Sequence, residues 1–420
     1  MKKLITIVMA LALLSSTAIC QSKTTQMTAE KWAKDLDYLG KKIDKEFNSF
    51  DPSVKGKFRT ELATLKSKVN DLENHEVACE IMRLLSLLQD GHTELNIGHR
   101  KVGFHRVPLS LYIFEGRFYV LAAHKDHAEL VGGTVTHIGA QPIHQAFERL
   151  KQNMSHDNDM EFLHAGPGYI ILTELLSCLG LSEDPNTAVF TIQKTDGTST
   201  KQIFKGLDQP TYSKGPWATY AGQNNLPKRL SDKNRDKSYW YEYLEEEQTL
   251  YFHFRRVNNQ KGQPSIGRFN RSLFEEIDRL KPEKLVIDLR QNNGGNYHLT
   301  KPIVQAITAR DWLNQKGKVW VMTGRLTFSA ASTMAIFMKQ ETNAILIGEP
   351  GRTHPNWADN NEYMSLPNSD YLIEYTTKVK VHWPERPDVD RVPVDVVMPP
   401  TFETYQKGQD AALEYILNYK

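Results

Sequence analysis

The sequence predicts a mixed α/β protein built from three structural units. Apolar residues recur at helical spacing through residues 28–90, so this stretch predicts helices. From residue 107 onward, short apolar runs separated by turn residues predict strands. From residue 238, strands and amphipathic helices alternate, which is typical of helices packed on a largely parallel sheet.

The chain has 420 residues, enough for two or three domains. After an N-terminal export segment at 1–20, we expect a helical domain over 21–100, a β-rich middle domain over 101–235 and an α/β domain over 236–420. The middle domain ends in a polar stretch rich in Gly, Pro and Asn, residues 206–236, which is a candidate linker.

The elements are expected in the following order. The first domain should hold three helices, with apolar residues at Trp32, Leu36, Leu39 and Ile43, then Leu62, Leu65 and Val69, then Ile81, Leu84, Leu85 and Leu88. In the middle domain, Glu115-Gly116-Arg117 should turn a hairpin, followed by strands near Val135, 188–192 and 201–204 and helices at 143–150 and 159–180. The third domain should hold strands at 249–254, 285–289, 319–322 and 344–348 and helices at 269–280, up to about 307, 329–339 and 410–419.

The N-terminus has the features of a secretory signal peptide. Lys2 and Lys3 precede an apolar stretch at 4–14, and Ala18-Ile19-Cys20 fits a small-x-small cleavage site. Lipid attachment at Cys20 is the weaker interpretation, because Ile19 is bulky where a lipoprotein signal prefers a small residue. We therefore expect a protein exported to the periplasm or beyond, with no integral membrane span, since no other segment is long and apolar enough.

Charge and cysteine content narrow the function classes. A net charge of +2, from 52 basic and 50 acidic residues, predicts neither a nucleic-acid partner nor attraction to an anionic membrane surface. Cys79 and Cys178 remain after cleavage, and export allows a disulfide, although two buried thiols would fit equally well. No Cys/His cluster has the spacing of a zinc site.

Ser329 opens an expected helix shortly after an apolar strand. A hydroxyl at a helix N-terminus lies near free N–H groups that can stabilise an oxyanion. The same position suits a serine that only caps the helix, and on this segment alone capping is the simpler interpretation.

Two further segments carry polar residues at expected chain turns. Asp288 ends an apolar strand, and Gly294-Gly295 follow at the carboxyl edge of the sheet, where α/β proteins bind ligands. These glycines could present N–H groups to an oxyanion, or serve only as turn residues. His92 lies in Asp90-Gly91-His92-Thr93, between a helix and an extended segment, and is one of 14 histidines.

At these segments the chain resembles the C-terminal processing, or tail-specific, serine peptidases, in the subset related to the tricorn protease core. The matching pieces occur in the family's order: Asp90-Gly91-His92-Thr93, Asp288-Leu289-Arg290 with Gly294-Gly295, Phe328-Ser329-Ala330, and Ile347-Gly348-Glu349-Pro350. The resemblance implies a PDZ-like middle segment around 132–139 and a crotonase-like α/β catalytic domain. It also implies a peptide or protein substrate and no metal or cofactor.

The resemblance assigns roles to individual residues. Ser329 would be the nucleophile, and Gly294 or Gly295 together with Ala330 would supply the oxyanion-hole N–H groups. The family uses either a lysine about 25 residues after the serine or a histidine as base. No lysine occurs from residue 341 to 377, so His92 is the expected base. The carboxylate behind it would be Glu385, Asp388 or Asp390, about 60 positions after the serine.

Three other functions compete with the peptidase. A non-catalytic protein on the same scaffold would bind an apolar small molecule or a peptide. A crotonase-like acyl-CoA enzyme conflicts with export, and a β-sandwich adhesin conflicts with the α/β alternation. The chain also departs from the family after Gly-Glu-Pro, where Gly351-Arg352-Thr353-His354 replaces Thr-Gly-Gly and leaves substrate specificity open.

Overall fold

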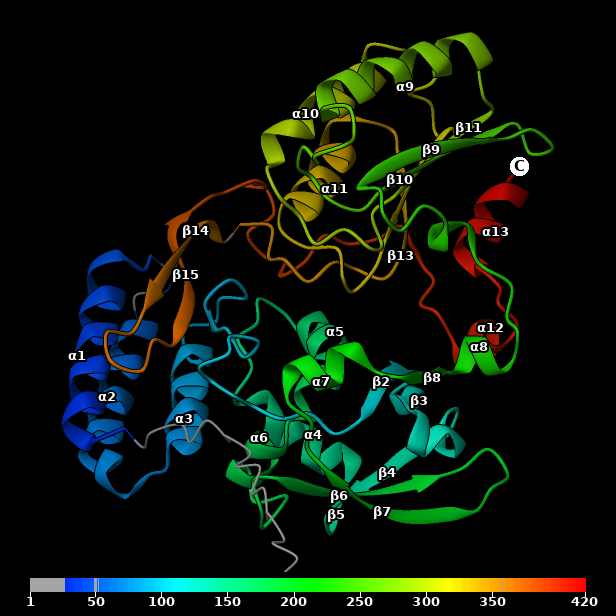
Figure 1. Ribbon diagram of the computed structural model, residues 1–420. Coiled ribbons are helices and arrows are strands. Elements are labelled where there is room, and N and C mark those ends of the chain that lie inside the picture. The colour runs from blue at the N-terminus through cyan, green and yellow to red at the C-terminus, as the bar shows by residue number, and fades with distance from the viewer. Residues whose placement is uncertain (1–26, 49–50, 52, 357) are drawn as a thin grey trace, which may run out of the picture.

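The computed structural model describes residues 27–48, 51, 53–356 and 358–420 and has a mixed α/β fold, as the sequence predicts (Figure 1). The expected signal peptide at 1–20, with Cys20, lies outside the described residues. Within the described ranges, no helix combines the length and the apolar character that crossing a bilayer would require.

The N-terminal unit is the expected set of three helices. Its helices are α1 (Ala29–Glu46), α2 (Ser53–Lys68), the 3-10 turn η1 (Val69–Asp71) and α3 (Asn74–Ser86). Thr28 caps α1 by accepting the Lys31 N–H, and the apolar stripe of α1 is fully buried, at Trp32, Leu36, Leu39 and Ile43. Helical spacing of large apolar residues therefore sets both the helices and the face that each one buries.

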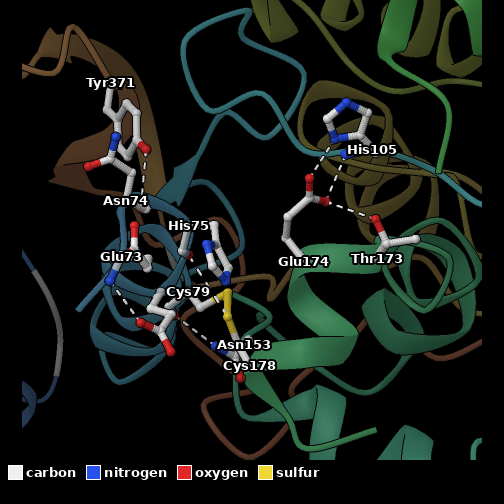
Figure 2. Close-up of a disulfide and its surroundings, with 11 residues drawn as sticks. Glu73, Asn74, His75, Cys79, His105, Asn153, Thr173, Glu174, Cys178 and Tyr371 are labelled. Atoms are coloured by element: carbon white, nitrogen blue, oxygen red, sulfur yellow. Dashed lines mark hydrogen bonds and ion pairs between the residues drawn. A yellow bond between two sulfur atoms is a disulfide. The ribbon is translucent and has the colours of Figure 1, made fainter. Parts of the chain in front are cut away.

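A disulfide joins this unit to the middle domain (Figure 2). Cys79 lies in α3 and Cys178 ends α6 (Thr173–Cys178), and their Cα atoms are 6.6 Å apart. Beside it, the Asn153 side chain donates to the Cys79 carbonyl at 2.8 Å. Of the two interpretations that the sequence left open, the structure therefore has the bonded one.

The middle domain is an antiparallel sheet flanked by helices. Its strands are β2 (Leu109–Phe114), β3 (Arg117–His124), β4 (Thr134–Ile138), β5 (Gln141–Pro142), β6 (Thr187–Gln193), β7 (Ser199–Lys205) and β8 (Trp217–Thr219). Its helices are η2 (Lys125–Leu130), α4 (Ile143–Lys151), α5 (Met160–Tyr169) and α6, with α7 (Gln209–Lys214), α8 (Tyr220–Gln223) and η3 (Leu230–Asp232) in the expected linker. Glu115 and Gly116 both have positive φ, which confirms the expected hairpin turn.

The C-terminal α/β unit is a six-stranded sheet in the order β16-β13-β12-β11-β10-β9. Its strands are β9 (Tyr239–Leu244), β10 (Thr249–Phe254), β11 (Lys284–Asp288), β12 (Val319–Thr323), β13 (Ile345–Gly348) and β16 (Val396–Val397). Its helices are α9 (Ile266–Leu280), η4 (Tyr297–Leu299), α10 (Lys301–Thr308), α11 (Ala330–Glu341), α12 (Phe402–Gln406) and α13 (Ala411–Asn418). Only β9 pairs antiparallel, so the largely parallel sheet is confirmed, and separate apolar cores cover its two faces.

One hairpin lies apart from the sheet that surrounds it in sequence. Strand β15 (Leu372–Val379) pairs with β14 (Ala358–Ser365) on one side and with β1 (Glu94–Leu95) on the other, beside the N-terminal helices (Figure 1). Asp35 of α1 accepts the backbone N–H groups of Asn368 and Ser369, both at 2.8 Å. The domain boundary expected at residue 236 places this hairpin in the last domain. Its buried apolar residues, however, pack in the same core as those of the N-terminal helices.

Candidate active site

A pocket of about 450 Å³ lies between the C-terminal sheet and the N-terminal unit. Two sets of residues line it: Asn293, Gly295, Phe328, Ser329 and Arg352 from the loops after β11, β12 and β13, and Gly91, His92, Glu94, Asn361, Tyr363 and Glu374 from the N-terminal unit and the β14–β15 hairpin. The carboxyl ends of parallel strands meet at one sheet edge, which explains why three separate loops share this pocket.

Ser329 is held in a conformation that a side chain rarely adopts. Its φ is 51° and its ψ is −123°, and its backbone N–H donates to the Thr353 hydroxyl at 2.6 Å. If Ser329 merely capped α11, its hydroxyl would accept an N–H of the first helical turn. Among the described residues it makes no such bond, so capping does not explain this serine. Strained residues of this kind cluster at functional sites.

Gly294 allows the loop after β11 to approach Ser329. Its φ is 97°, and a methyl group there would lie 2.7 Å from the Ser329 Cβ. Asn292 holds the loop, because its side chain donates to the Phe254 carbonyl at 2.7 Å and accepts the Gly294 N–H at 2.8 Å. A larger residue at position 294 would therefore collide with Ser329 and displace it.

The predicted oxyanion donors differ in their availability. The Gly294 N–H is already bonded to Asn292. The Gly295 and Ala330 N–H groups donate to no acceptor within the described part of the chain. Ala330 begins α11, and its nitrogen lies 3.1 Å from where a Gly294 Cβ would be. Helix N-termini carry unsatisfied N–H groups that favour negative charge.

His92 lines the same pocket from a turn after α3. Its ring stacks on Phe328, the residue before Ser329, with centroids 4.2 Å apart. Behind it, the buried Asp90 carboxylate lies 3.8 Å from the His92 Nδ1 and accepts the His92 backbone N–H at 3.1 Å. Asp90 also accepts the Thr93 hydroxyl, so one carboxylate organises the whole turn.

Asp157 joins the histidine turn to the loop after β13. It accepts the Gly91 N–H at 2.6 Å and the His354 N–H at 3.1 Å. Burial, with the nearby Asp90 charge, raises the pKa of Asp157 to about 8. These bonds tie two segments that are far apart in sequence on either side of the pocket.

Within the described part of the chain, Asp90, His92 and Asp157 form a group that could hold a metal ion, because their ligand atoms lie within 4.8 Å of one another. Both carboxylates, however, already accept hydrogen bonds from the protein: Asp90 from His92 and Thr93, Asp157 from Gly91 and His354. Their arrangement is therefore explained by the turn that they build.

Arg352 links the loop after β13 to helix α5 through a buried ion pair. Its guanidinium binds Glu161 of α5 and donates to Asn293 at 2.6 Å, and it lies 3.7 Å from the centre of the Phe328 ring. Burial raises the pKa of Glu161, although Arg352 opposes this shift.

Two acidic residues line the same pocket as Ser329. Glu94 of β1 and Glu374 of β15 are directly opposed strand partners. Burial, with the charges of Glu161 and Glu374, raises the pKa of Glu94 to about 7. Burial also raises the pKa of Glu374.

The structure thus brings together Ser329, His92, Gly295 and Ala330 but not the acidic residues expected after the serine. Glu385 and Asp388 are exposed and are not among the residues that line the pocket, and Asp388 forms an ion pair with Arg386 at 3.0 Å. Asp390 is exposed as well and pairs with Arg391.

Sequence reasoning gave no role to several residues of the pocket. Asp90 lies two residues before His92 in the segment Asp90-Gly91-His92-Thr93, and this spacing could have predicted that its carboxylate lies near the histidine. Arg352 was noted only as a departure from the family pattern. Asp157, Glu94 and Glu374 carry no local signal, because their neighbours in space come from other parts of the chain.

Comparisons with known proteins place the fold. No protein-family model matches the chain, and no curated protein matches its sequence. Among solved structures, a serine-to-alanine mutant of CPAF matches with a TM-score of 0.64 at 11% identity, covering 93% of this chain and 98% of that one. Mature CPAF complexed with lactacystin matches at 0.61 and 11%, covering 93% and 99%. The photosystem II D1 C-terminal processing protease matches at 0.40 and 12%, covering 92% and 99%. The described chain therefore has the fold of CPAF over almost its full length.

Proposed function

We propose that the chain is a serine peptidase that hydrolyses peptide bonds through a Ser329 acyl-enzyme, with His92 as general base. The observation that carries the proposal is that Ser329, strained at a helix start, and His92, from far upstream, line one pocket beside Gly295. The fold of CPAF is consistent with this proposal, but a fold hosts many functions and the site has to carry the argument.

The proposed cycle follows from the geometry. The Ser329 Oγ attacks a peptide carbonyl carbon while His92 takes the hydroxyl proton. The oxyanion accepts hydrogen bonds from the Gly295 and Ala330 N–H groups, each worth roughly 3–4 kcal/mol of barrier. His92 then protonates the departing amine, and water releases the acyl group by the reverse sequence.

Asp90 is our proposed orienting carboxylate, in place of the acids near residue 388. It is buried and lies on the Nδ1 side of His92, whereas Asp388 is exposed and paired with Arg386. A buried carboxylate at this position favours the charged imidazole that forms during proton transfer.

The test is covalent labelling of Ser329 by a fluorophosphonate, followed by peptide mapping and by hydrolysis of an unstructured protein substrate. We expect stoichiometric labelling at Ser329, competition by lactacystin, and loss of labelling and hydrolysis in Ser329→Ala and His92→Ala. Peptide binding without any labelling of Ser329 would instead support the non-catalytic alternative.

Ser265 provides the matched control. It also precedes a helix, but its hydroxyl caps α9 by accepting the Arg268 N–H. Ser265→Ala should lower the free energy of unfolding by about 1 kcal/mol and keep the labelling, whereas Ser329→Ala should lose the labelling and keep the stability. The reverse pattern would contradict the assignment.

We also propose that the chain works outside the cytoplasm, in the periplasm or beyond. The signal-like segment at 1–20 supports this, and a disulfide between Cys79 and Cys178 suits an oxidising compartment. Mass spectrometry of the exported protein should find a mature chain that begins at Gln21; retention of the full chain in the cytoplasm would contradict export.

A further inference from the structure

We propose that the pocket selects substrates with a positively charged side chain, lysine or arginine, which the carboxylates of Glu94 and Glu374 receive beside Ser329. This inference rests on the proposed function and names its substrate class.

The two carboxylates are placed at a cost to the fold. Glu94 and Glu374 are opposed partners on neighbouring antiparallel strands, and like charges in this arrangement destabilise a strand pair. Both line the pocket that contains Ser329, so their negative charge faces any substrate that reaches the nucleophile. A bound cation would turn this repulsion into attraction.

The Arg352 charge lowers the pKa of Glu94, but Arg352 forms no ion pair with either acid. Within the described residues, neither acid forms an ion pair: Glu94 accepts the Tyr169 hydroxyl at 3.3 Å, and Glu374 accepts the Asn361 amide and the Tyr363 hydroxyl. Arg352 lines the pocket, and its guanidinium is already bound to Glu161.

Arg352 is not available to neutralise the pair. It is 7% exposed, and its guanidinium is bound to Glu161 and Asn293. A substrate with a basic side chain would therefore bring its cation to two carboxylates that line the pocket without an ion-pair partner among the described residues.

Two further features fit a basic side chain. Tyr363, 59% exposed, also lines the pocket, and an aromatic ring can cover the alkyl stem of a lysine or arginine. Burial raises the pKa of Glu94 to about 7, so the surroundings of Glu94 disfavour its charged form, which a neighbouring cation would stabilise.

The experiment uses an uncharged fluorophosphonate to report Ser329 and a pair of nearly isosteric competitors, benzamidine, which is cationic, and benzamide, which is neutral. We expect benzamidine to slow labelling at least tenfold more strongly than benzamide. In Glu94→Gln/Glu374→Gln, the two competitors should act equally. Asp370→Asn removes a charge at the exposed tip of the same hairpin and should keep the difference.

The outcomes separate this inference from the proposed function. No labelling at all would refute the nucleophile. Labelling that benzamidine and benzamide slow equally would overturn the basic-substrate inference and leave the peptidase intact. Protection by calcium chloride but not by benzamidine would also overturn it, because the two carboxylates would then be a metal site.

A second readout uses substrates. Fluorogenic peptides that differ only in lysine or norleucine before the cleaved bond should differ at least tenfold in kcat/KM, and the double variant should lose this ratio. Equal kcat/KM values in the unmodified enzyme, at every position tested, would contradict the inference. If the double variant unfolds, Glu374→Gln alone should reduce the ratio.

Discussion

The two walls of the pocket are built in different ways. The serine wall consists of loops at the carboxyl edge of a parallel sheet, where Asn292, Gly294 and Thr353 set the backbone around Ser329 by short hydrogen bonds and close contact. The opposite wall comes from a small antiparallel sheet, β1-β15-β14, that carries the paired acids Glu94 and Glu374.

The two walls have different proposed tasks: the serine wall carries the chemistry, and the acidic wall recognises the substrate. The serine wall positions N–H groups and a hydroxyl with little freedom, which the proposed chemistry requires. The acidic wall lies on a hairpin whose core contacts are with the N-terminal helices (Figure 1). Its side chains could therefore change without disturbing the nucleophile, and the following predictions probe this separation.

The largest effect is expected at Arg352, which joins the serine wall to helix α5. Arg352→Met leaves the buried Glu161 without its cation, which should lower the free energy of unfolding by about 3–5 kcal/mol, measured by urea denaturation. The exposed pair of Arg386 and Asp388 is the control, and Arg386→Met should leave the urea midpoint unchanged. Equal shifts in the two variants would contradict the stabilising role of the buried Arg352–Glu161 pair.

The next effect concerns the serine wall alone. Gly294→Ala forces a methyl group to 2.7 Å from the Ser329 Cβ at a φ of 97°, so labelling of Ser329 should slow at least about 100-fold. Gly267→Ala is the control, because a methyl group there meets nothing within 4 Å. Full activity in Gly294→Ala would mean that this close approach is not needed.

The smallest effect concerns the acidic wall and depends on pH. Glu94 faces Glu161, Glu374, Arg352 and Tyr169, and its pKa is raised from 4.5 to about 7. The folded state therefore binds more protons than the unfolded state between these values, and this group's contribution to stability is lost as pH rises through that window. As the pH rises from 4.5 to 7.5, the free energy of unfolding of Glu94→Gln should increase by roughly 2 kcal/mol relative to that of the unmodified chain, as measured by thermal or urea unfolding. A constant difference across this range would contradict the raised pKa.

Much of the local structure could be read from the sequence. Helical spacing located α1, α2 and α3, and the run of apolar strands located β10, β11, β12 and β13. The turn Glu115-Gly116 was found because turn residues with positive φ have a local signature, and the segment around Ser329 because it follows an apolar strand and opens a helix.

Neither the acidic wall nor the partner of His92 could be found in this way. The expectation of an acid near residue 388 relied on spacing along the chain, whereas the structure sets Asp90 behind His92 and leaves Asp388 in solvent. The strands β14 and β15 went unrecognised, and the pairing of β15 with β1 joins segments about 280 residues apart, which no local pattern indicates.

The sequence by itself determined the helices, most strands, the turns and the strand-to-helix segment that carries Ser329, because propensity, periodicity and positive φ act over a few neighbouring residues. Only the tertiary structure decided that Cys79 and Cys178 are bonded, that His92 lines one pocket with that serine and that Glu94 opposes Glu374. These pairings depend on burial and contact between distant segments, for which spacing along the chain carries no information.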